Sequence, residues 1–507
     1  MATKAALDAP ALTPERLQTV RGTLKSPRRL KTEVLAGLVV ALALIPEAIA
    51  FSIIAGVDPR IGLFASFTMA VTIAFVGGRP AMISAATGAV ALVIAPLVKS
   101  HGLDYLVAAV ILAGIFQIVL GLSGVARLMR FIPRSVMVGF VNALAILIFL
   151  SQVPELLGVP WLVYPLTALG LVIVFGLPKL TKAVPAPLVA IVVLTLITVF
   201  AAVAVPTVGD KGELPDSLPT LFIPNVPFTL ETLQVIFPFA LAMAFVGLLE
   251  SLMTAKLVDD ITDTRSHKTR EAWGQGVANI VTGVFGGMGG CAMIGQTMIN
   301  VKASGARTRI STFLAGVFLL ILVVVLGDIV SLIPMAALVA VMIFVSVATF
   351  DWHSIHLRTL KAMPKSETTV MVATVIVTVA THNLAIGVGG GVLVAMVMFV
   401  RRVAHFVTVE RSVKTIGGHE TATYVVDGEL FFASSNDLYT QFEYALDPEH
   451  VVIDMNASHL WDASTIAALD AITAKYHHHG KDVKIIGLND ASILMRQRLG
   501  GKLGAGH

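Results

Sequence analysis

Residues 33–406 form an almost continuous apolar stretch that is broken only by short polar turns. The chain is 56% hydrophobic and only 13% charged, and its apolar residues come in runs long enough to cross a bilayer. Within lipid the backbone polar groups must be bonded inside the protein, so these runs predict transmembrane α-helices. The sequence therefore predicts an all-α, multi-pass membrane domain, preceded by a basic segment at 1–32 and followed by a different domain at 410–507.

At about 20 residues per span, the apolar stretch holds about 14 helices. We expect two sets of seven, and the third span of each set is short because it begins part-way through the bilayer. The linker 207–230, which is acidic and contains several prolines, suits an outside loop. The expected spans are 34–56, 61–76, 87–98, 105–122, 135–151, 165–177 and 186–205, then 234–256, 272–287, 305–312, 312–329, 335–349, 367–381 and 385–403.

The clusters of positive charge all fall on one side of these spans, which the positive-inside rule makes cytoplasmic. Seven spans is an odd number, so the second repeat (about 231–406) must be inverted relative to the first (about 33–206), as in many secondary transporters. We expect a cell (inner) membrane protein whose N-terminus and C-terminal domain are cytoplasmic. The charges are Arg16, Arg21, Lys25, Arg28, Arg29 and Lys31 in the leader, and Arg127, Arg130, Arg134, Lys179, Lys182, Lys256, Arg265, His267, Lys268, Arg270, Lys361, Lys365, Arg401 and Arg402 after later spans.

A four-residue phrase occurs in both halves: Ala-Thr-Gly-Ala at 86–89 and Ala-Ser-Gly-Ala at 303–306. Ile-Pro pairs at 132–133 and 333–334 also precede corresponding spans. Paired interrupted helices are the best sequence indication of a transporter's binding site. We therefore expect two half-helices to begin at these phrases and to face one another.

A helix that begins at mid-membrane presents unpaired N–H groups and a partial positive charge, which together favour an anion. Glycine at such a start lets the ligand approach the backbone, and hydroxyls add donors. The sequence thus predicts a site for a small inorganic or organic anion. Its expected residues are Thr87, Gly88, Ala89, Ser304, Gly305, Ala306 and, as a nearby full charge, Arg307.

Glu47 and Glu250 are the carboxylates deepest in the apolar runs, and they occupy corresponding helices. A carboxylate at this depth is costly and usually functional, although a structural hydrogen bond between helices is the alternative. A proton or a hard cation such as sodium would neutralise it. We expect the coupling ion, H⁺ or Na⁺, at Glu47, Glu250, Thr254, Gly295, Gln296 and Thr297, with sodium at Glu250, Thr254 and Thr297. The sequence indicates no other metal site and no cofactor.

Residues 410–507 alternate short apolar runs with ordinary charge density, which favours a small α/β domain. Strands are expected at 424–426, 430–432, 451–455 and 483–488. Helices are expected from Ala463, capped by Asp462, and from Asp490. No Walker motif, zinc-ligand pair or nucleophile elbow is present, so the sequence supports neither an ATP-driven pump nor an enzyme, and nothing indicates nucleic-acid binding.

Several stretches resemble the SulP family of anion transporters, the sulfate-permease relatives of pendrin and prestin. They are 46–51 (Pro-Glu-Ala-Ile-Ala-Phe), the third-span entry at 83–88, and the segment 249–308. The resemblance implies a core domain and a gate domain, an anion held between the third and tenth helix termini, and a homodimer with elevator-like movement. The tail is similar to the STAS domain, which implies a cytoplasmic partner. The serine that is phosphorylated in related antagonists is Ala463 here, so Ser464 is the candidate regulatory residue.

This chain departs from the family at informative positions. Ser84-Ala85-Ala86-Thr87-Gly88 stands in place of Ser-x-Gly-Pro, and Glu47 and Thr297 replace the residues of chloride exchangers and voltage sensors. We therefore expect a secondary active symporter, coupled to protons or sodium, of sulfate, bicarbonate or a dicarboxylate. Two alternatives stay open: a nucleobase permease of the same fold, and a non-transporting membrane scaffold that acts through the STAS domain.

Overall fold

The computed structural model describes residues 19–124, 132–180, 185–404, 407–416 and 419–500. The chain divides into two compact units, Met1–Val392 and Leu393–His507, and the division falls inside helix α15 (Leu384–Ala404). Each unit is described by itself below. Of the charges used above for orientation, Arg16, Arg127, Arg130 and Lys182 lie outside the described residues.

The helical membrane architecture is confirmed, and eight of the described helices are long and apolar enough to cross a bilayer. Gly102, with φ 80° and ψ −168°, interrupts α4, which therefore supplies both the third and the fourth segment. With α4 counted twice, the described residues contain fourteen segments, and all but the tenth, α10, match the expected spans. They are α2 (Pro27–Ala55), α3 (Pro59–Val76), α4 (Gly88–Leu122), α5 (Arg134–Gln152), α6 (Val163–Leu180), α7 (Ala186–Phe200), α8 (Leu230–Thr262), α9 (Lys268–Val284), α10 (Ile294–Met298), α11 (Arg309–Ser331), α12 (Met335–Thr349), α14 (Lys365–Thr381) and α15, with short helices α1 (Val20–Leu24) and α13 (Leu357–Ala362) outside this count.

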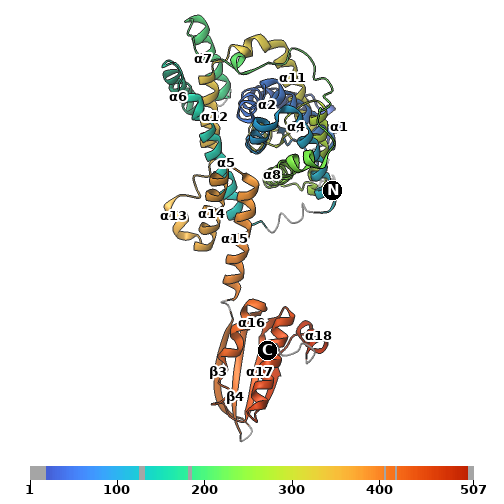
Figure 1. The fold of residues 1–507 in the computed structure, drawn as a ribbon, viewed down its shortest axis with the longest axis vertical. Coiled ribbons are helices and arrows are strands. Elements are labelled where there is room, and N and C mark those ends of the chain that lie inside the picture. The colour runs from blue at the N-terminus through green and yellow to red at the C-terminus, as the bar shows by residue number, and fades with distance from the viewer. Residues whose placement is uncertain (1–18, 125–131, 181–184, 405–406, 417–418, 501–507) are drawn as a thin grey trace, which may run out of the picture. The chain divides into compact units, whose positions relative to one another are not determined.

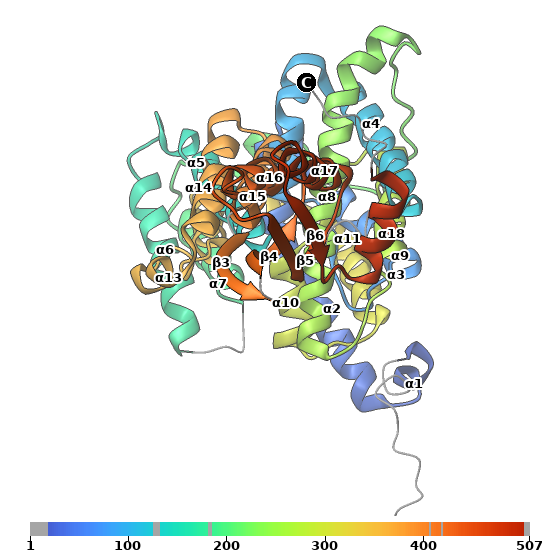
Figure 2. The same ribbon diagram turned by 90° about the horizontal axis from the view of Figure 1, so that it is seen from below.

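The helices of the first unit form two groups (Figures 1 and 2). The core group contains α2, α3, α4, α8, α9, α10 and α11, and the gate group contains α5, α6, α7, α12 and α14. Within the core group, α4 and α9 pack at glycines: a Cβ on Gly114 would lie 2.6 Å from the carbonyl oxygen of Gly276. Such close backbone approach is how membrane helices gain packing energy without a hydrophobic driving force.

A two-stranded sheet lies inside the core group. Strand β1 (Ser84–Ala85) pairs antiparallel with β2 (Cys291–Ala292), with Ser84 opposite Ala292 and Ala85 opposite Cys291. β1 leads into α4 and β2 leads into α10, so corresponding elements of the two halves meet in opposite directions. The tenth segment therefore begins at Ile294 and continues as a π-helical turn over Ile299–Ala303, and the helix expected at 305–312 is wrong.

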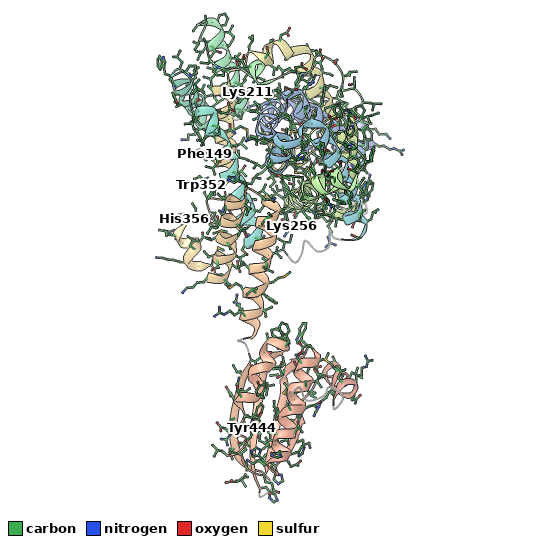
Figure 3. The ribbon with its side chains drawn as sticks, in the orientation of Figure 1. Phe149, Lys211, Lys256, Trp352, His356 and Tyr444 are labelled. Atoms are coloured by element: carbon green, nitrogen blue, oxygen red, sulfur yellow. The ribbon has the colours of Figure 1, made fainter. Side chains whose placement is uncertain are left out.

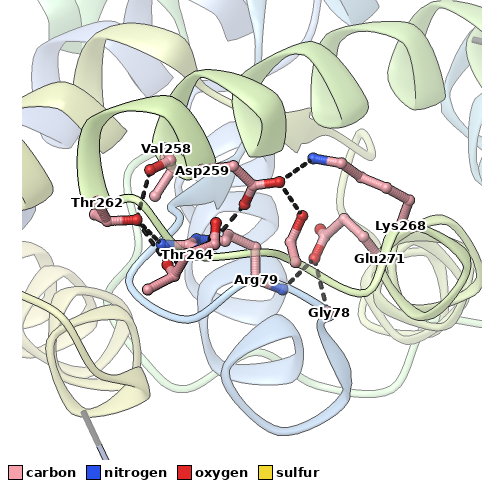
Figure 4. A network of polar contacts seen from close by, with 9 residues as sticks. Gly78, Arg79, Val258, Asp259, Thr262, Thr264, Lys268 and Glu271 are labelled. Carbon is pink, nitrogen blue, oxygen red and sulfur yellow. Dashed lines mark hydrogen bonds and ion pairs between the residues drawn. The ribbon is translucent and has the colours of Figure 1, made fainter. Parts of the chain in front are cut away.

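A polar network fixes the chain just before β1 (Figure 4). The Arg79 guanidinium contacts Asp259 at 3.0 Å, Thr262 at 2.6 Å and Thr264 at 2.8 Å. Glu271 accepts hydrogen bonds from the backbone N–H groups of Gly78 and Arg79, at 2.7 and 2.9 Å. Because Asp259 belongs to α8 and Glu271 to α9, both helices hold the segment that enters the sheet.

The second unit is an α/β domain whose sheet has the strand order β3-β4-β5-β6. Strands β3 and β4 are antiparallel, and the other neighbouring pairs are parallel. The predicted capping of α17 by Asp462 is confirmed, since its carboxylate accepts from the N–H of Thr465. The strand expected at 430–432 is wrong: β4 ends at Leu430 and a helix begins at Phe432, whose N–H is bonded to Asp462 at 2.6 Å. The elements are β3 (Thr408–Ile416), β4 (His419–Leu430), α16 (Phe432–Leu438), β5 (His450–Leu460), α17 (Ala463–His478), β6 (Asp482–Ile486) and α18 (Asp490–Leu499).

Asp447 is the polar centre of this unit's core and is 5% exposed. It accepts hydrogen bonds from Tyr424 at 2.7 Å and Tyr476 at 2.5 Å, and it forms an ion pair with Arg411 at 2.7 Å. Burial, together with the Asp447 hydrogen bond, raises the pKa of Tyr476 and keeps it a donor. Ser464 is exposed at the second residue of α17.

Candidate functional site

A cavity of about 720 Å³ lies between the core group and the gate group. Its core wall carries the helix starts and all the polar side chains but Thr349, and its gate wall is otherwise apolar. Glu47 and Glu250 are the only ionisable side chains among the described residues that line it. The core wall comprises Val39, Ala43, Glu47, Phe51, Thr87, Gly88, Glu250, Met293, Ile294, Gly295, Gln296, Met298, Ile299, Ala303 and Ser304; the gate wall comprises Phe140, Val141, Leu144, Ile148, Pro178, Pro185, Ala186, Pro187, Phe344, Val345, Ala348 and Thr349.

Helix α4 begins at this cavity, as the sequence predicted. Thr87 is its N-cap, with the hydroxyl oxygen 3.4 Å from the N–H of Val90. Gly88 is the first helical residue and lines the cavity, whereas Ala89 is fully buried. A Cβ at Gly88 would lie 2.9 Å from the Phe51 ring, so only glycine keeps this helix start open.

Helix α10 begins on the same wall. The N–H of Met293 donates to the carbonyl of Ile83 at 2.9 Å, which extends the β1–β2 pairing up to the helix. Gly295 is exposed to the cavity, and open space surrounds the position of an added Cβ. In each half the glycine comes three residues after the strand ends: Ala85 to Gly88 and Ala292 to Gly295. The sheet thereby brings two helix starts to one cavity.

The second anion-binding phrase does not mark a helix start, and that placement is corrected here. Residues 303–306 begin at the last residue of the π-helical turn, and there the N–H of Ser304 donates to Ile299 and that of Ala306 to Asn300. Ser304 still lines the cavity, but Gly305, Ala306 and Arg307 are not among its lining residues. The phrase therefore lies at the C-terminal end of the half-helix, where backbone carbonyls rather than N–H groups are free.

The Arg307 guanidinium satisfies those carbonyls. It donates to Val301 at 2.6 Å and to Ala306 at 2.8 Å. The N–H groups of Arg307 and Thr308 bond instead to one carboxylate oxygen of Glu33, and Ser311 bonds to the other. Glu33 thus caps the start of α11 from another helix, a role that the sequence analysis missed because no local pattern signals it.

Arg307→Ala is accordingly expected to lower stability more than affinity. Two backbone carbonyls lose a charged donor, which costs about 1–3 kcal/mol. The anion dissociation constant should change less than threefold, because the side chain does not reach the cavity. Thermal unfolding and radiolabelled-anion binding in detergent check both halves of this expectation. A tenfold weaker affinity with unchanged unfolding would return Arg307 to the anion site.

The two acidic side chains each accept a hydrogen bond from a residue of the second half. Glu47 of α2 accepts a hydrogen bond from the Gln296 amide at 2.7 Å. Glu250 of α8 accepts one from the Cys291 thiol at 2.9 Å, and that thiol also lies 3.1 Å from the hydroxyl of Thr87. Cys291 therefore links a carboxylate to the N-cap of α4. This role could not be predicted from the sequence, because a buried cysteine in a two-residue strand gives no periodic signal.

The hydroxyls of Thr254 and Thr297, the remaining residues of the expected coupling site, bond to backbone groups. The Thr254 hydroxyl donates to the backbone carbonyl of Glu250 at 2.7 Å. The Thr297 hydroxyl accepts from the N–H of Ile83 at 3.0 Å. Both threonines are fully buried and neither is among the cavity-lining residues. Of the expected set, Glu47, Glu250, Gly295 and Gln296 share the cavity.

Comparison with known proteins identifies the family of this chain. Residues 30–165 and 161–374 match the model of the Sulfate permease family, and residues 410–500 match that of the STAS domain. The chain belongs to the sulfate permease family. It is 56% identical over 469 residues to the Bacillus subtilis (strain 168) protein named "Putative sulfate transporter YbaR", covering 92% of this chain and 97% of that protein.

Solved structures of this family share the fold. The transmembrane domain of a cyanobacterial bicarbonate transporter, BicA, is 25% identical, with a TM-score of 0.61 over 71% of this chain and 98% of that chain. Murine Slc26a9, solved as an inward-facing anion transporter, is 17% identical with a TM-score of 0.77, over 93% of this chain and 87% of that chain. The protein is thus a multi-pass membrane protein of an anion transporter family, not an enzyme, and this selects against the nucleobase permease alternative.

Proposed function

We propose that this chain is a proton-coupled symporter that takes up a small oxyanion, with sulfate as the first candidate. One observation carries the proposal: two helix starts and two carboxylates share a cavity whose described lining contains no basic side chain. The helix starts favour an anion. An ionised carboxylate in the same cavity opposes it, since like unit charges about 4 Å apart repel by about 4 kcal/mol at an effective dielectric constant of 20.

The anion and a neutralising cation must therefore enter together, which is the requirement for symport. Geometry favours a proton over sodium in this role. Neither Thr254 nor Thr297 is among the residues that line the cavity, so their hydroxyls add no oxygen ligands for a sodium ion bound there. A proton needs only one carboxylate oxygen. Glu47, which lines the cavity, is the residue that we assign to it.

The two walls of the cavity support movement of the core group against the gate group. The groups that would hold the anion and the proton all belong to core elements, whereas Phe140, Leu144, Ile148 and Phe344 give the gate an apolar face. An apolar face makes no directional bonds, so the core could slide along it with the anion attached. The anion would then cross the membrane as in an elevator.

Substrate identity is tested with purified protein in liposomes. Uptake of radiolabelled sulfate is measured under an inward pH gradient without sodium, in competition with bicarbonate, fumarate and uracil. We expect sulfate to enter against its gradient and uracil not to compete. Uptake that follows an imposed sodium gradient and does not depend on pH would show that the coupling ion is sodium rather than a proton. The similarity to BicA, a bicarbonate transporter, makes bicarbonate the second candidate, and stronger competition by bicarbonate than by unlabelled sulfate would favour it.

We also propose how the protein is oriented in the membrane and how it assembles. The basic clusters support an inner-membrane protein with a cytoplasmic N-terminus and STAS domain. Family resemblance supports a homodimer and a cytoplasmic partner for the STAS domain, with exposed Ser464 as a candidate point of regulation. Anion flux that persists after deletion of residues 410–507 would exclude the scaffold alternative.

A further inference from the structure

Gln296 has one satisfied and one unsatisfied end. Its amide nitrogen donates to Glu47 at 2.7 Å. Its amide oxygen is buried and has no hydrogen-bond partner among the described residues. The residue is 1% exposed and lines the cavity. A buried acceptor without a partner costs about 1–3 kcal/mol, so this arrangement needs an explanation.

The two ends of a carboxamide exchange places when the group rotates by 180°, and they differ only in donating or accepting. An ionised Glu47 is an acceptor only, so it requires the nitrogen of Gln296 to face it. A protonated Glu47 carries an O–H donor, which the oxygen of Gln296 can accept. Rotation then places the nitrogen where the unsatisfied oxygen was, and the site gains an N–H donor.

We propose that Gln296 is a two-position switch, set by the protonation of Glu47, that offers the bound anion an N–H donor only when Glu47 carries a proton. The inference rests on the proposed function and deepens it, because it says how the proton and the anion are coupled. With Glu47 ionised, an acceptor oxygen stands beside the anion site and repels the anion. With Glu47 protonated, a donor replaces it. Gln296 is thus a positioning residue between the proton site and the helix starts.

The position of Gln296 suits this role. It is the third residue of α10, so its side chain is anchored beside the helix start at Ile294. Within the part of the chain that the structure describes, the other titratable groups that face the cavity or its carboxylates are Glu250 on α8 and the Cys291 thiol bonded to it. Their hydrogen bond is made without Gln296. The switch therefore involves Glu47 on α2 and Gln296 on α10, and it crosses from one repeat to the other.

The test is the pH dependence of radiolabelled sulfate binding to the full-length protein, from about pH 5 to about pH 8. For the wild type we expect the dissociation constant to rise about tenfold per pH unit where Glu47 loses its proton, since one proton is linked to one anion. For Gln296→Met we expect weaker binding whose dissociation constant changes about threefold per pH unit instead of tenfold, because only the direct repulsion between ionised Glu47 and the anion then remains. Gln296→Asn, whose shorter side chain cannot reach both partners, should behave in the same way if the methionine variant does not fold.

Gln275 provides a matched control. It is also buried, donates to a carboxylate, Glu271, at 2.8 Å, and has an amide oxygen without a partner among the described residues, but it is not among the residues that line the cavity. Gln275→Met should keep the tenfold slope. A wild-type slope in Gln296→Met, lost only in Glu47→Gln, would overturn the switch and leave proton coupling intact. No slope in the wild type itself would overturn the proposed function as well.

Discussion

Glu47→Gln is expected to abolish concentrative sulfate uptake driven by a pH gradient, so that internal sulfate only equilibrates with external sulfate. The amide cannot gain or lose the coupling proton, yet it keeps the size of the carboxyl and can donate as the protonated acid does. Anion binding should therefore persist and lose its pH dependence. The measurement is uptake into proteoliposomes under an imposed gradient, together with binding in detergent.

Glu231→Gln is the control for this experiment, because Glu231 is exposed in the first turn of α8 and is not among the residues that line the cavity. It should retain full gradient-driven accumulation. If Glu47→Gln accumulated sulfate like the wild type, Glu47 would not carry the proton. Loss of binding as well as transport would place Glu47 in anion binding itself.

Gly290→Ala is expected to remove both binding and transport. A Cβ at this position would lie 2.0 Å from the carbonyl oxygen of Ala85, a backbone atom of β1. The backbone cannot yield there without separating β1 from β2, and the start of α10 depends on that pairing. Overpacking of this kind costs about 1–3 kcal/mol or more. We expect sulfate affinity to fall at least tenfold and the unfolding temperature to fall with it.

Gly176→Ala on α6 is the matched change, since nothing lies within 4 Å of the added Cβ. It should leave affinity and unfolding at their wild-type values. Thermal unfolding and equilibrium binding of both variants make the comparison. A Gly290→Ala protein with normal sulfate affinity would show that the strand pairing does not define the site.

The order of membrane helices could be predicted from the sequence because span length and charge placement are imposed by the bilayer. The break at the start of α4 was also predictable, since Thr87 is an N-cap residue and Gly88 follows it. Glu47 and Glu250 were identifiable for a related reason: acidic residues are rare inside apolar helices.

The start of the second half-helix was not predictable in this way. The two strands are only two residues long, and neither β1 nor β2 has a period that a sequence window can detect. The correspondence of Ala85–Gly88 with Ala292–Gly295 keeps only its first and last residues, so the better match at 303–306 was misleading. The pairing of β1 with β2 is a tertiary contact, and it decides which segment of the second half begins a helix at the cavity.

Contacts between distant segments also explain the missed residues. Glu33 and the start of α11 are far apart in sequence, and only the packing of α2 beside α11 lets Glu33 accept from the N–H groups of Thr308 and Ser311. Cys291 gains its role from Glu250 on α8 and Thr87 before α4. In the second unit, the helix at Phe432 required the carboxylate of Asp462, which lies thirty residues away. Each of these hydrogen bonds gives a partner to a backbone N–H or a carboxylate group for which the neighbouring residues in the sequence provide none.

The central claim is that the anion lies at the starts of α4 and α10, and cysteine protection tests it most directly. Cys291, the only cysteine of the chain, is replaced by serine, and a cysteine is introduced either at Gly295 or at Arg307. The rate of alkylation is then measured with and without saturating sulfate. We predict that sulfate slows modification at position 295 at least tenfold and leaves position 307 unchanged. Protection at 307 with none at 295 would contradict the account and place the anion at the other end of the half-helix.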